Sequence, residues 1–488
     1  MGKILLFLLI ASAGIGALAR PWIGVHSYYL LAILGPQYIW WWNFEGLRVS
    51  FVISICTILG VLYKVLESKY NYQLLINKQN FWVALLWFAI AISYLFGPYA
   101  TNLPGSLLYA ASVIFIFYFI SVMEIDRLFK LRILVLIFVV STIFLTYWAN
   151  KQYLDMNLMQ FNYGRLMGPY SLLGGAIYKD ENAFAILFVT GLPFVYYYAW
   201  AVKRLWLRCA LWLVIPLGWH AVFLTGSRGG LVGLLVIVLL VIFLSKRKFL
   251  AMPLILLFLF FFQWQAGDTM KSRSDTIADY DQETSAQMRI DAWTGGMRMI
   301  ADHPLTGVGL GTFANALPDY HDTAPRVAHN TFMQFAAESG VFAGIAYIAI
   351  LFNFFRNFRR IHETASSLPE DEESQQINLY NKASFVSFSG LIVCSLFLSL
   401  NNYEIFFVLL IISNSLNQIC KNLLEGESLV EETEQKKIAS ALHPQVVDNV
   451  HGQRCDQILQ NVHRVSGSWG VAAISSRGRF LGPAAEHH

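Results

Sequence analysis

The sequence has few charged residues for its length. Only 14% of its 488 residues are charged, whereas soluble globular chains carry roughly a quarter. With 56% hydrophobic residues and a mean hydropathy of +0.50, the chain has more apolar surface than one aqueous core can bury. Stretches such as 231–244 and 384–400 are apolar on all sides, which is typical of helices surrounded by lipid. The composition therefore excludes a water-soluble fold.

Cysteine and net charge are also low. The five cysteines are scattered and form no CxxC motif, so the sequence indicates neither a disulfide framework nor a zinc site. The formal net charge of +4 is small and lies mostly on one face of the predicted topology. It therefore reports orientation in a membrane and indicates no binding of nucleic acid.

Apolar segments predict an all-α polytopic membrane protein with about 12 transmembrane helices, each close to the roughly 20 residues that a bilayer requires. The expected spans are 3–19, 47–63, 81–97, 105–123, 131–148, 183–200, 209–225, 229–245, 249–265, 333–355, 383–400 and 404–420. The basic loops fall on one face only if both termini are cytoplasmic. We therefore expect a bacterial inner-membrane protein whose loops 149–182 and 266–332 face the periplasm.

The amino-terminal region is the hardest to assign. The run after Lys3 lacks a small-residue cleavage site near Arg20, so we expect a retained first helix with Lys3 in the cytoplasm. This leaves Arg20 on the disfavoured side. Segment 22–42 is apolar but contains His26, Pro36 and three consecutive tryptophans, which favours an interfacial or re-entrant stretch.

This topology divides the chain into four parts. Residues 1–265 contain the first nine transmembrane helices and an outer loop at 149–182, and residues 266–332 form a long periplasmic loop with short amphipathic helices. Residues 333–423 contain the last three transmembrane helices. The polar tail 424–488 lacks sustained periodicity, so we expect it to be cytoplasmic and disordered.

Arginines on the expected periplasmic face run against the positive-inside rule. Arg228 lies in a Gly-rich turn between two apolar spans, where a guanidinium costs about 2.5 to 3.5 kcal/mol at mid-depth and less near the interface. The alternative is a turn residue that contacts lipid phosphate. Arg165, Arg289 and Arg298 lie on the same face, although Arg289 could equally pair with Asp291 on a solvated helix. Arginine binds phosphate oxygens bidentately and stays charged, so these residues predict a lipid pyrophosphate site.

His329 lies at the mouth of the next span. Histidine can accept a proton from a hydroxyl near neutral pH, which is the work of a general base. A structural hydrogen-bonding role is the alternative for a lone interfacial histidine, but arginines on the same face favour catalysis. His303 and His321 rank lower because neither lies at the lipid boundary.

Other polar and glycine-rich segments are weaker candidates. Segment 306–311 repeats Gly-x-Gly-x-Gly but lacks the strand and helix of a nucleotide fold, so we interpret it as a tight turn packed near a ligand. Asn182 begins a span beside Asp180, for which helix capping is the plain alternative. Asp279 and Asp281 look like a metal-binding carboxylate pair, but a solvated loop is the preferred interpretation.

These residues together resemble the O-antigen ligase and polymerase superfamily of bacterial envelope enzymes. The resemblance covers roughly residues 160–350. It rests on the Ser227-Arg228-Gly229 turn and on the stretches 289–293, 303–309, 329–330 and 338–340. Residues 20–24 resemble more loosely the exosortase-associated O-glycosylation ligase branch.

The resemblance implies a GT-C-type fold and a metal-independent inverting glycosyltransferase without a cofactor. Such an enzyme moves a glycan from undecaprenyl pyrophosphate to the hydroxyl of a glycan, lipid A-core or protein acceptor at the membrane surface. His329 matches the family's essential histidine, Arg228 and Arg289 match arginines thought to hold the pyrophosphate, and Arg165 matches a further basic position. We also expect four residues to contact the donor: Asn182, Asn330, Gly307 and Gly309.

Two alternatives stay open. A polymerase differs from a ligase only in its acceptor, and the sequence does not separate the two. A transporter of lipid-linked glycan would also suit a dozen spans, but transporters usually carry internal repeats and Gly/Pro-broken helices at mid-membrane. Neither feature is clear in this sequence.

Overall fold

The computed structural model describes residues 2–45, 47–67, 70–101, 103–170, 178–245, 252–267, 271 and 284–447. The chain divides into two compact units, Met1–Asn422 and Leu423–His488. Everything below concerns the first unit unless stated otherwise.

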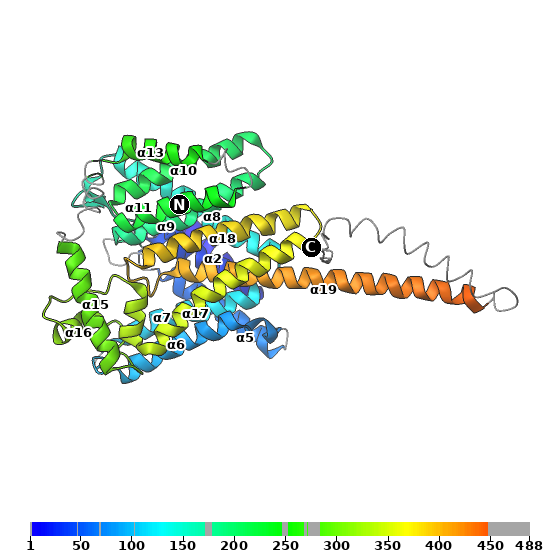
Figure 1. The fold of residues 1–488 in the computed structure, drawn as a ribbon, viewed down its shortest axis with the longest axis horizontal. Helices are drawn as coiled ribbons and strands as arrows, with labels where there is room; N and C mark the ends of the chain where they lie inside the picture. Colours follow the sequence, from blue (N-terminus) through cyan, green and yellow to red (C-terminus); the bar gives the residue numbers. More distant parts are fainter. Residues whose placement is uncertain are drawn as a thin grey trace, which may run out of the picture. The chain divides into compact units, whose positions relative to one another are not determined.

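The described residues are almost entirely helical (Figure 1). The long helices are α1 Gly2–Ala19, α2 Pro21–Leu34, α5 Val49–Leu66, α6 Lys78–Phe96, α7 Gly105–Glu124, α8 Leu128–Leu154, α9 Glu181–Ala201, α10 Leu205–Thr225, α11 Arg228–Leu244, α13 Pro253–Gln265, α15 Thr284–Asp302, α17 Thr331–Ser367, α18 Glu372–Ser395 and α19 Glu404–Val447. Short helices are α3 Pro36–Ile39, α4 Trp41–Phe44, η1 Tyr72–Leu75, η2 Leu158–Gln160 and α16 Phe313–Tyr320. Two-residue strands β1 Phe161–Asn162 and β2 Arg165–Leu166 form an antiparallel hairpin.

Eight of the described helices are long and apolar enough to cross a membrane, and four further apolar helices are shorter. The all-α, multi-pass membrane character predicted from the sequence is therefore confirmed, whereas the count of about 12 spans stays a prediction. The expected span 383–400 differs from the structure, because α18 begins at Glu372 and ends at Ser395. The expected outer loop 149–182 begins later, because α8 continues to Leu154.

Helix α9 is central and packs against α8, α10, α11 and α18. Small residues allow these close approaches. A Cβ on Gly191 would lie 2.1 Å from Thr142 of α8, and one on Gly233 of α11 would lie 2.6 Å from Cys394 of α18. Backbones that approach through small residues gain van der Waals contact, which stabilises helix pairs where lipid removes the hydrophobic driving force.

The expected re-entrant alternative for segment 22–42 stays a prediction, whereas α2 lies inside the bundle and not along its surface. Helix α2 packs between α1, α5, α7 and α8. Its end contacts the start of α5 through Leu31 and Val49, while a Cβ on Gly24 near its start would lie 2.0 Å from Thr57 further along α5. The two helices therefore run antiparallel inside the bundle, which the sequence interpretation missed.

The start of α2 lies at the basic end of the bundle. The His26 ring nitrogens lie 2.6 Å from the carbonyl oxygen of Trp22 and 2.8 Å from that of Lys130, near the start of α8. Arg20, just before α2, therefore belongs to the end that the sequence assigns to the cytoplasm, which removes its expected violation of the positive-inside rule. Helix α1 ends at this basic end of the bundle, so its first residues, including Lys3, lie toward the opposite end. This is contrary to the expectation that Lys3 is cytoplasmic.

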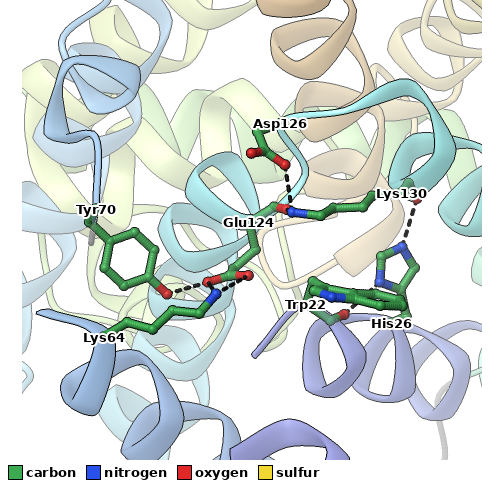
Figure 2. A network of polar contacts seen from close by, with 7 residues as sticks. All are labelled: Trp22, His26, Lys64, Tyr70, Glu124, Asp126 and Lys130. Carbon is green, nitrogen blue, oxygen red and sulfur yellow. Dashed lines mark hydrogen bonds and ion pairs between the residues drawn. The ribbon is translucent and has the colours of Figure 1, made fainter. Parts of the chain in front are cut away.

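A polar network holds this basic end together (Figure 2). The Glu124 side chain is 1% exposed and accepts from Lys64 at 3.0 Å and from the Tyr70 hydroxyl. Lys130 donates to the Glu124 carbonyl oxygen at 2.8 Å and to the Asp126 carboxylate. The ends of α5, α7 and α8 are thereby joined through charges that are paired rather than left alone in the low dielectric.

The expected periplasmic loop contains α15 and α16, which lie together beside α17 (Figure 1). They share a small apolar core formed by Ala292, Met299, Phe313 and Leu317. The tail differs from the expected disorder in part, because α19 continues to Val447. Residues 448–488 lie outside the described part of the chain.

Candidate active site

A cavity of about 350 Å³ lies where α9 and α11 begin. Its lining comes from parts of the chain that are far apart in the sequence: Arg165, Asn182, Arg228, Gly229, Met288, Arg289, Pro325, Arg326, His329, Phe397 and Leu398. Four arginines and one histidine thus surround one space. Such a concentration of positive charge predicts an anionic ligand.

Arg228 is the first residue of α11, and the local sequence fixes its place. Gly226 has a φ of 60° and ends α10, and the Ser227 hydroxyl then caps α11 by accepting from the Gly230 amide at 3.1 Å. A Cβ on Gly230 would lie 2.7 Å from that of Ala185, so glycine lets the start of α11 approach α9 closely. The Arg228 charge therefore adds to the positive end of a helix dipole, which is a natural anion site.

Arg165 is held in place by a hairpin and by three oxygen atoms. The turn residues Tyr163 and Gly164 have positive φ values of 49° and 74°, which suits a two-residue turn between paired strands. The Arg165 Nε donates to the Thr225 carbonyl at 3.0 Å and its Nη2 to Asn182 Oδ1 at 3.1 Å. Its Nη1 lies 3.8 Å from a Glu181 carboxylate oxygen. The guanidinium is therefore preorganised at the cavity.

Arg289 reaches the cavity from α15. Its guanidinium carbon lies 6.0 Å from the centre of the Phe397 ring, which is within the range of a cation–π contact. The indole of Trp293 donates to the Ala328 carbonyl at 2.8 Å. This hydrogen bond ties the helix that carries Arg289 to the residue before His329.

His329 has an unusual backbone and a shifted pKa. Its φ of 48° lies in the left-handed region, which residues with a Cβ atom rarely adopt. Such a backbone costs about 1 to 3 kcal/mol and persists mainly where surrounding contacts enforce it. The next residue, Asn330, caps α17 by accepting from the Met333 amide at 3.0 Å. Burial lowers the pKa of His329, the nearby positive charges of Arg289 and Arg326 lower it further, and Asp180 opposes them. The imidazole is therefore neutral near pH 7 and can accept a proton.

The sequence analysis missed Arg326. It lines the cavity, and its Nε donates to the Ala324 carbonyl at 3.2 Å. The positive-inside argument that selected Arg289 applies equally to this residue, so the signal was available. Phe397 and Leu398 were also missed, because they lie in the connector after α18, which the sequence assigned to the end of a span.

Asn330, Gly307 and Gly309 do not line this cavity, and their assignment to the substrate site stays a prediction. Asn330 is occupied by the cap of α17 and by a bond from its Nδ2 to the Leu396 carbonyl at 3.3 Å. Gly307 has a φ of 63°, and a Cβ there would lie 2.3 Å from the Glu338 backbone. Gly309 likewise donates its amide to the Glu338 carbonyl at 3.1 Å.

The glycine segment 306–311 packs against a kink in α17. The helix is interrupted at Ser339 and Gly340, where the backbone leaves helical geometry. Val308 donates to the carbonyl of Ala337, which the kink leaves without its partner inside the helix. The glycines therefore position the helix that follows His329.

The remaining sequence candidates lie elsewhere. Arg298 donates to the Tyr320 carbonyl at 2.6 Å, and His321 Nε2 lies 3.4 Å from Asp291. His303 packs edge-on to the Tyr320 ring. Asp279 and Asp281 lie outside the described residues. Within the described part of the chain, no group of three His, Cys, Asp or Glu side chains could hold a metal ion.

Comparison with known protein families gives a match to part of the chain. Residues 209–348 match the family described as O-Antigen ligase. The matched part runs from α10 into α17 and includes Arg228, Arg289, Arg326 and His329. This match confirms the resemblance to the O-antigen ligase-like superfamily and indicates activity of the ligase or polymerase type in general. No curated protein matches the chain.

Proposed function

We propose that the chain is an inverting, metal-independent glycosyltransferase of GT-C type. It transfers a glycan from undecaprenyl pyrophosphate to an acceptor hydroxyl at the periplasmic face of a bacterial inner membrane. The strongest support is the cavity of about 350 Å³ in which four arginines meet one histidine. A polymerase, whose acceptor is a second lipid-linked glycan, uses the same chemistry and is the alternative.

The arginines hold the pyrophosphate. A guanidinium remains charged and can donate two parallel hydrogen bonds to phosphate oxygens. Arg228 and Arg289 reach the cavity from two different helices, α11 and α15, and Arg326 adds a further charge. Fixed positive charge of this kind stabilises the negative charge that develops on the leaving group as the glycosidic bond breaks.

His329 acts as the general base. Its neutral ring takes the proton of the acceptor hydroxyl while the hydroxyl oxygen forms a bond to the anomeric carbon of the donor. The bond from this carbon to the pyrophosphate oxygen breaks, and its electron pair leaves with undecaprenyl pyrophosphate. Attack from the face opposite the leaving group inverts the anomeric centre. The lowered pKa of His329 supports this role, because the ring is unprotonated near neutral pH.

Arg165 and Asn182 position the donor. Arg165 already makes hydrogen bonds to Thr225 and Asn182, so its orientation costs no further ordering when substrate binds. Preorganised donors of this kind improve binding because less conformational entropy is lost. We therefore assign both residues to donor binding rather than to proton transfer.

The test uses purified protein, a lipid-linked donor and three acceptors in parallel: lipid A-core, a periplasmic protein and a second donor. His329→Ala is expected to lower turnover about 100-fold to 10,000-fold while donor binding stays within about twofold, because the arginines remain. His321→Ala is the matched control, since this histidine lies in the same loop outside the cavity. Near-normal turnover of the His329 variant would contradict the proposal, and loss of activity on adding a chelator would contradict the metal-independent mechanism.

A further inference from the structure

A second cavity of about 550 Å³ lies between α3, α4, the end of α8 and the outer loop. Aromatic side chains dominate one part of it, among them Trp40, Trp42, Tyr147 and Trp148. Trp42 is 51% exposed and Tyr147 is 59% exposed. These rings are therefore accessible to a ligand rather than consumed by the core.

Polar side chains form the other part of this aromatic groove. Asn157 Nδ2 donates to Gln152 Oε1 at 2.7 Å, so the Gln152 amide nitrogen and the Asn157 amide oxygen keep further capacity to donate and accept. Lys151 and Gln160 also line the groove. A belt of aromatic residues that only anchors a protein in the bilayer has no need of clustered amides.

The aromatic groove and the cationic cavity are both lined by residues in or next to the outer-loop hairpin. Gln160 lies two residues before Asn162, and Asn162 pairs directly with Arg165. Gln160 ends η2, and β1 begins at the next residue, Phe161. At the same time Trp148 packs edge-on to Phe184 with ring centres 5.9 Å apart, two residues after Asn182. Both sites therefore adjoin the outer-loop hairpin and the start of α9.

We propose that the aromatic groove binds the oligosaccharide part of a glycan substrate, beyond the sugar that reacts. A sugar ring offers an apolar face of C–H groups, which suits the electron-rich face of Trp or Tyr, and it offers hydroxyl groups around its edge, which suit amides. This inference rests on the proposed transferase function. The oligosaccharide belongs either to the donor or to the acceptor.

Trp42→Ala and Tyr147→Ala test the proposal, with Trp264→Ala as the matched control. Trp264 is 69% exposed on α13 and does not line the aromatic groove, so its variant reports the loss of a membrane-anchoring tryptophan alone. Turnover is measured with donors of one or several repeat units against a fixed acceptor, and then with acceptors of increasing glycan length against a fixed donor. Binding of the free oligosaccharide by the purified protein is measured in parallel.

We expect the groove variants to raise KM about tenfold for the long glycan and to leave KM for the single unit and kcat unchanged. If KM of the variants depends on the length of the donor glycan, the donor occupies the groove; if it depends on the length of the acceptor glycan, the acceptor does. If the groove variants leave KM unchanged at every glycan length, or raise KM equally at every glycan length, the assignment of the groove is overturned. If the wild-type protein transfers nothing but binds the free oligosaccharide in a groove-dependent way, the transferase proposal fails and the groove stands.

Discussion

The Arg165 guanidinium donates to Asn182 Oδ1 at 3.1 Å, and this bond joins the outer-loop hairpin to the first turn of α9. Arg165 of this hairpin lines the cationic cavity, and Gln160 just before the hairpin lines the aromatic groove. The Asn182 amide is therefore one of three oxygen partners, with Thr225 and Glu181, that orient the Arg165 charge toward the cavity.

Asn182→Ala tests this connection. Without the amide oxygen, Arg165 keeps its bond to the Thr225 carbonyl but loses a partner at its Nη2 atom. A hydrogen bond to a charged group contributes about 1.5 to 3 kcal/mol, so we expect KM for the donor to rise about tenfold or more with a smaller change in kcat. Asn162→Ala removes another amide of the same hairpin, which donates to Glu181 and not to Arg165. This variant should change KM for the donor much less. Equal effects of the two variants would show that the hairpin acts only as a whole.

Gly307→Ala separates a structural role from a ligand-binding role. The added Cβ would meet the Glu338 backbone at 2.3 Å, at a φ of 63° that disfavours a side chain. We expect a loss of about 2 kcal/mol or more in stability, seen as a lower midpoint of thermal unfolding in detergent. Donor KM measured on the remaining folded protein should change little. Gly267→Ala is the control, since a Cβ there meets nothing within 4 Å; a raised KM with unchanged stability would place Gly307 in the substrate site.

Long apolar segments made most of the bundle predictable from the sequence. The interfacial alternative for segment 22–42 arose because the sequence does not show the partners of His26, which are the carbonyl oxygens of Trp22 nearby and of Lys130, more than a hundred residues away. Sequence alone cannot show that such a polar group is satisfied inside a bundle. The same limit explains Gly307, whose close neighbour is the Glu338 backbone in a different helix.

The charged members of the site were easier to find than the apolar ones. The predicted residues Arg165, Arg228, Arg289 and His329 all line the cavity. They could be predicted because charged residues on the disfavoured side of a membrane are conspicuous in any sequence. Phe397 has no such signal, since an aromatic residue at the end of an apolar segment is ordinary. Its contribution to the cavity depends on where the connector after α18 folds.

Glu124 provides a test of the basic end of the bundle. Its carboxylate is 1% exposed and paired with Lys64 and Tyr70, so Glu124→Ala leaves a cation without its partner. Breaking a buried pair in this way costs about 3 to 5 kcal/mol, and we expect a clear fall in the unfolding midpoint. Asp126→Ala removes a carboxylate that is 36% exposed, and Lys130 keeps its hydrogen bond to the Glu124 carbonyl oxygen; a loss below about 1 kcal/mol is therefore expected there. Similar losses in both variants would argue against the network shown in Figure 2.

The pH dependence of transfer tests the electrostatics of His329 directly. Burial and then the Arg289 charge lower its pKa from the usual 6.5, so the ring is neutral above the lowered pKa and activity should fall only at pH values below 6.5. Arg289→Gln removes one cause of the shift and leaves burial in place. The acidic limb of kcat/KM against pH should therefore move to higher pH, toward the usual value. Arg298→Gln is the matched control, because Arg298 bonds the Tyr320 carbonyl in the same loop and does not line the cavity. A limb that stays in place in the Arg289 variant, or that moves equally in both variants, would mean that a group other than His329 takes the proton.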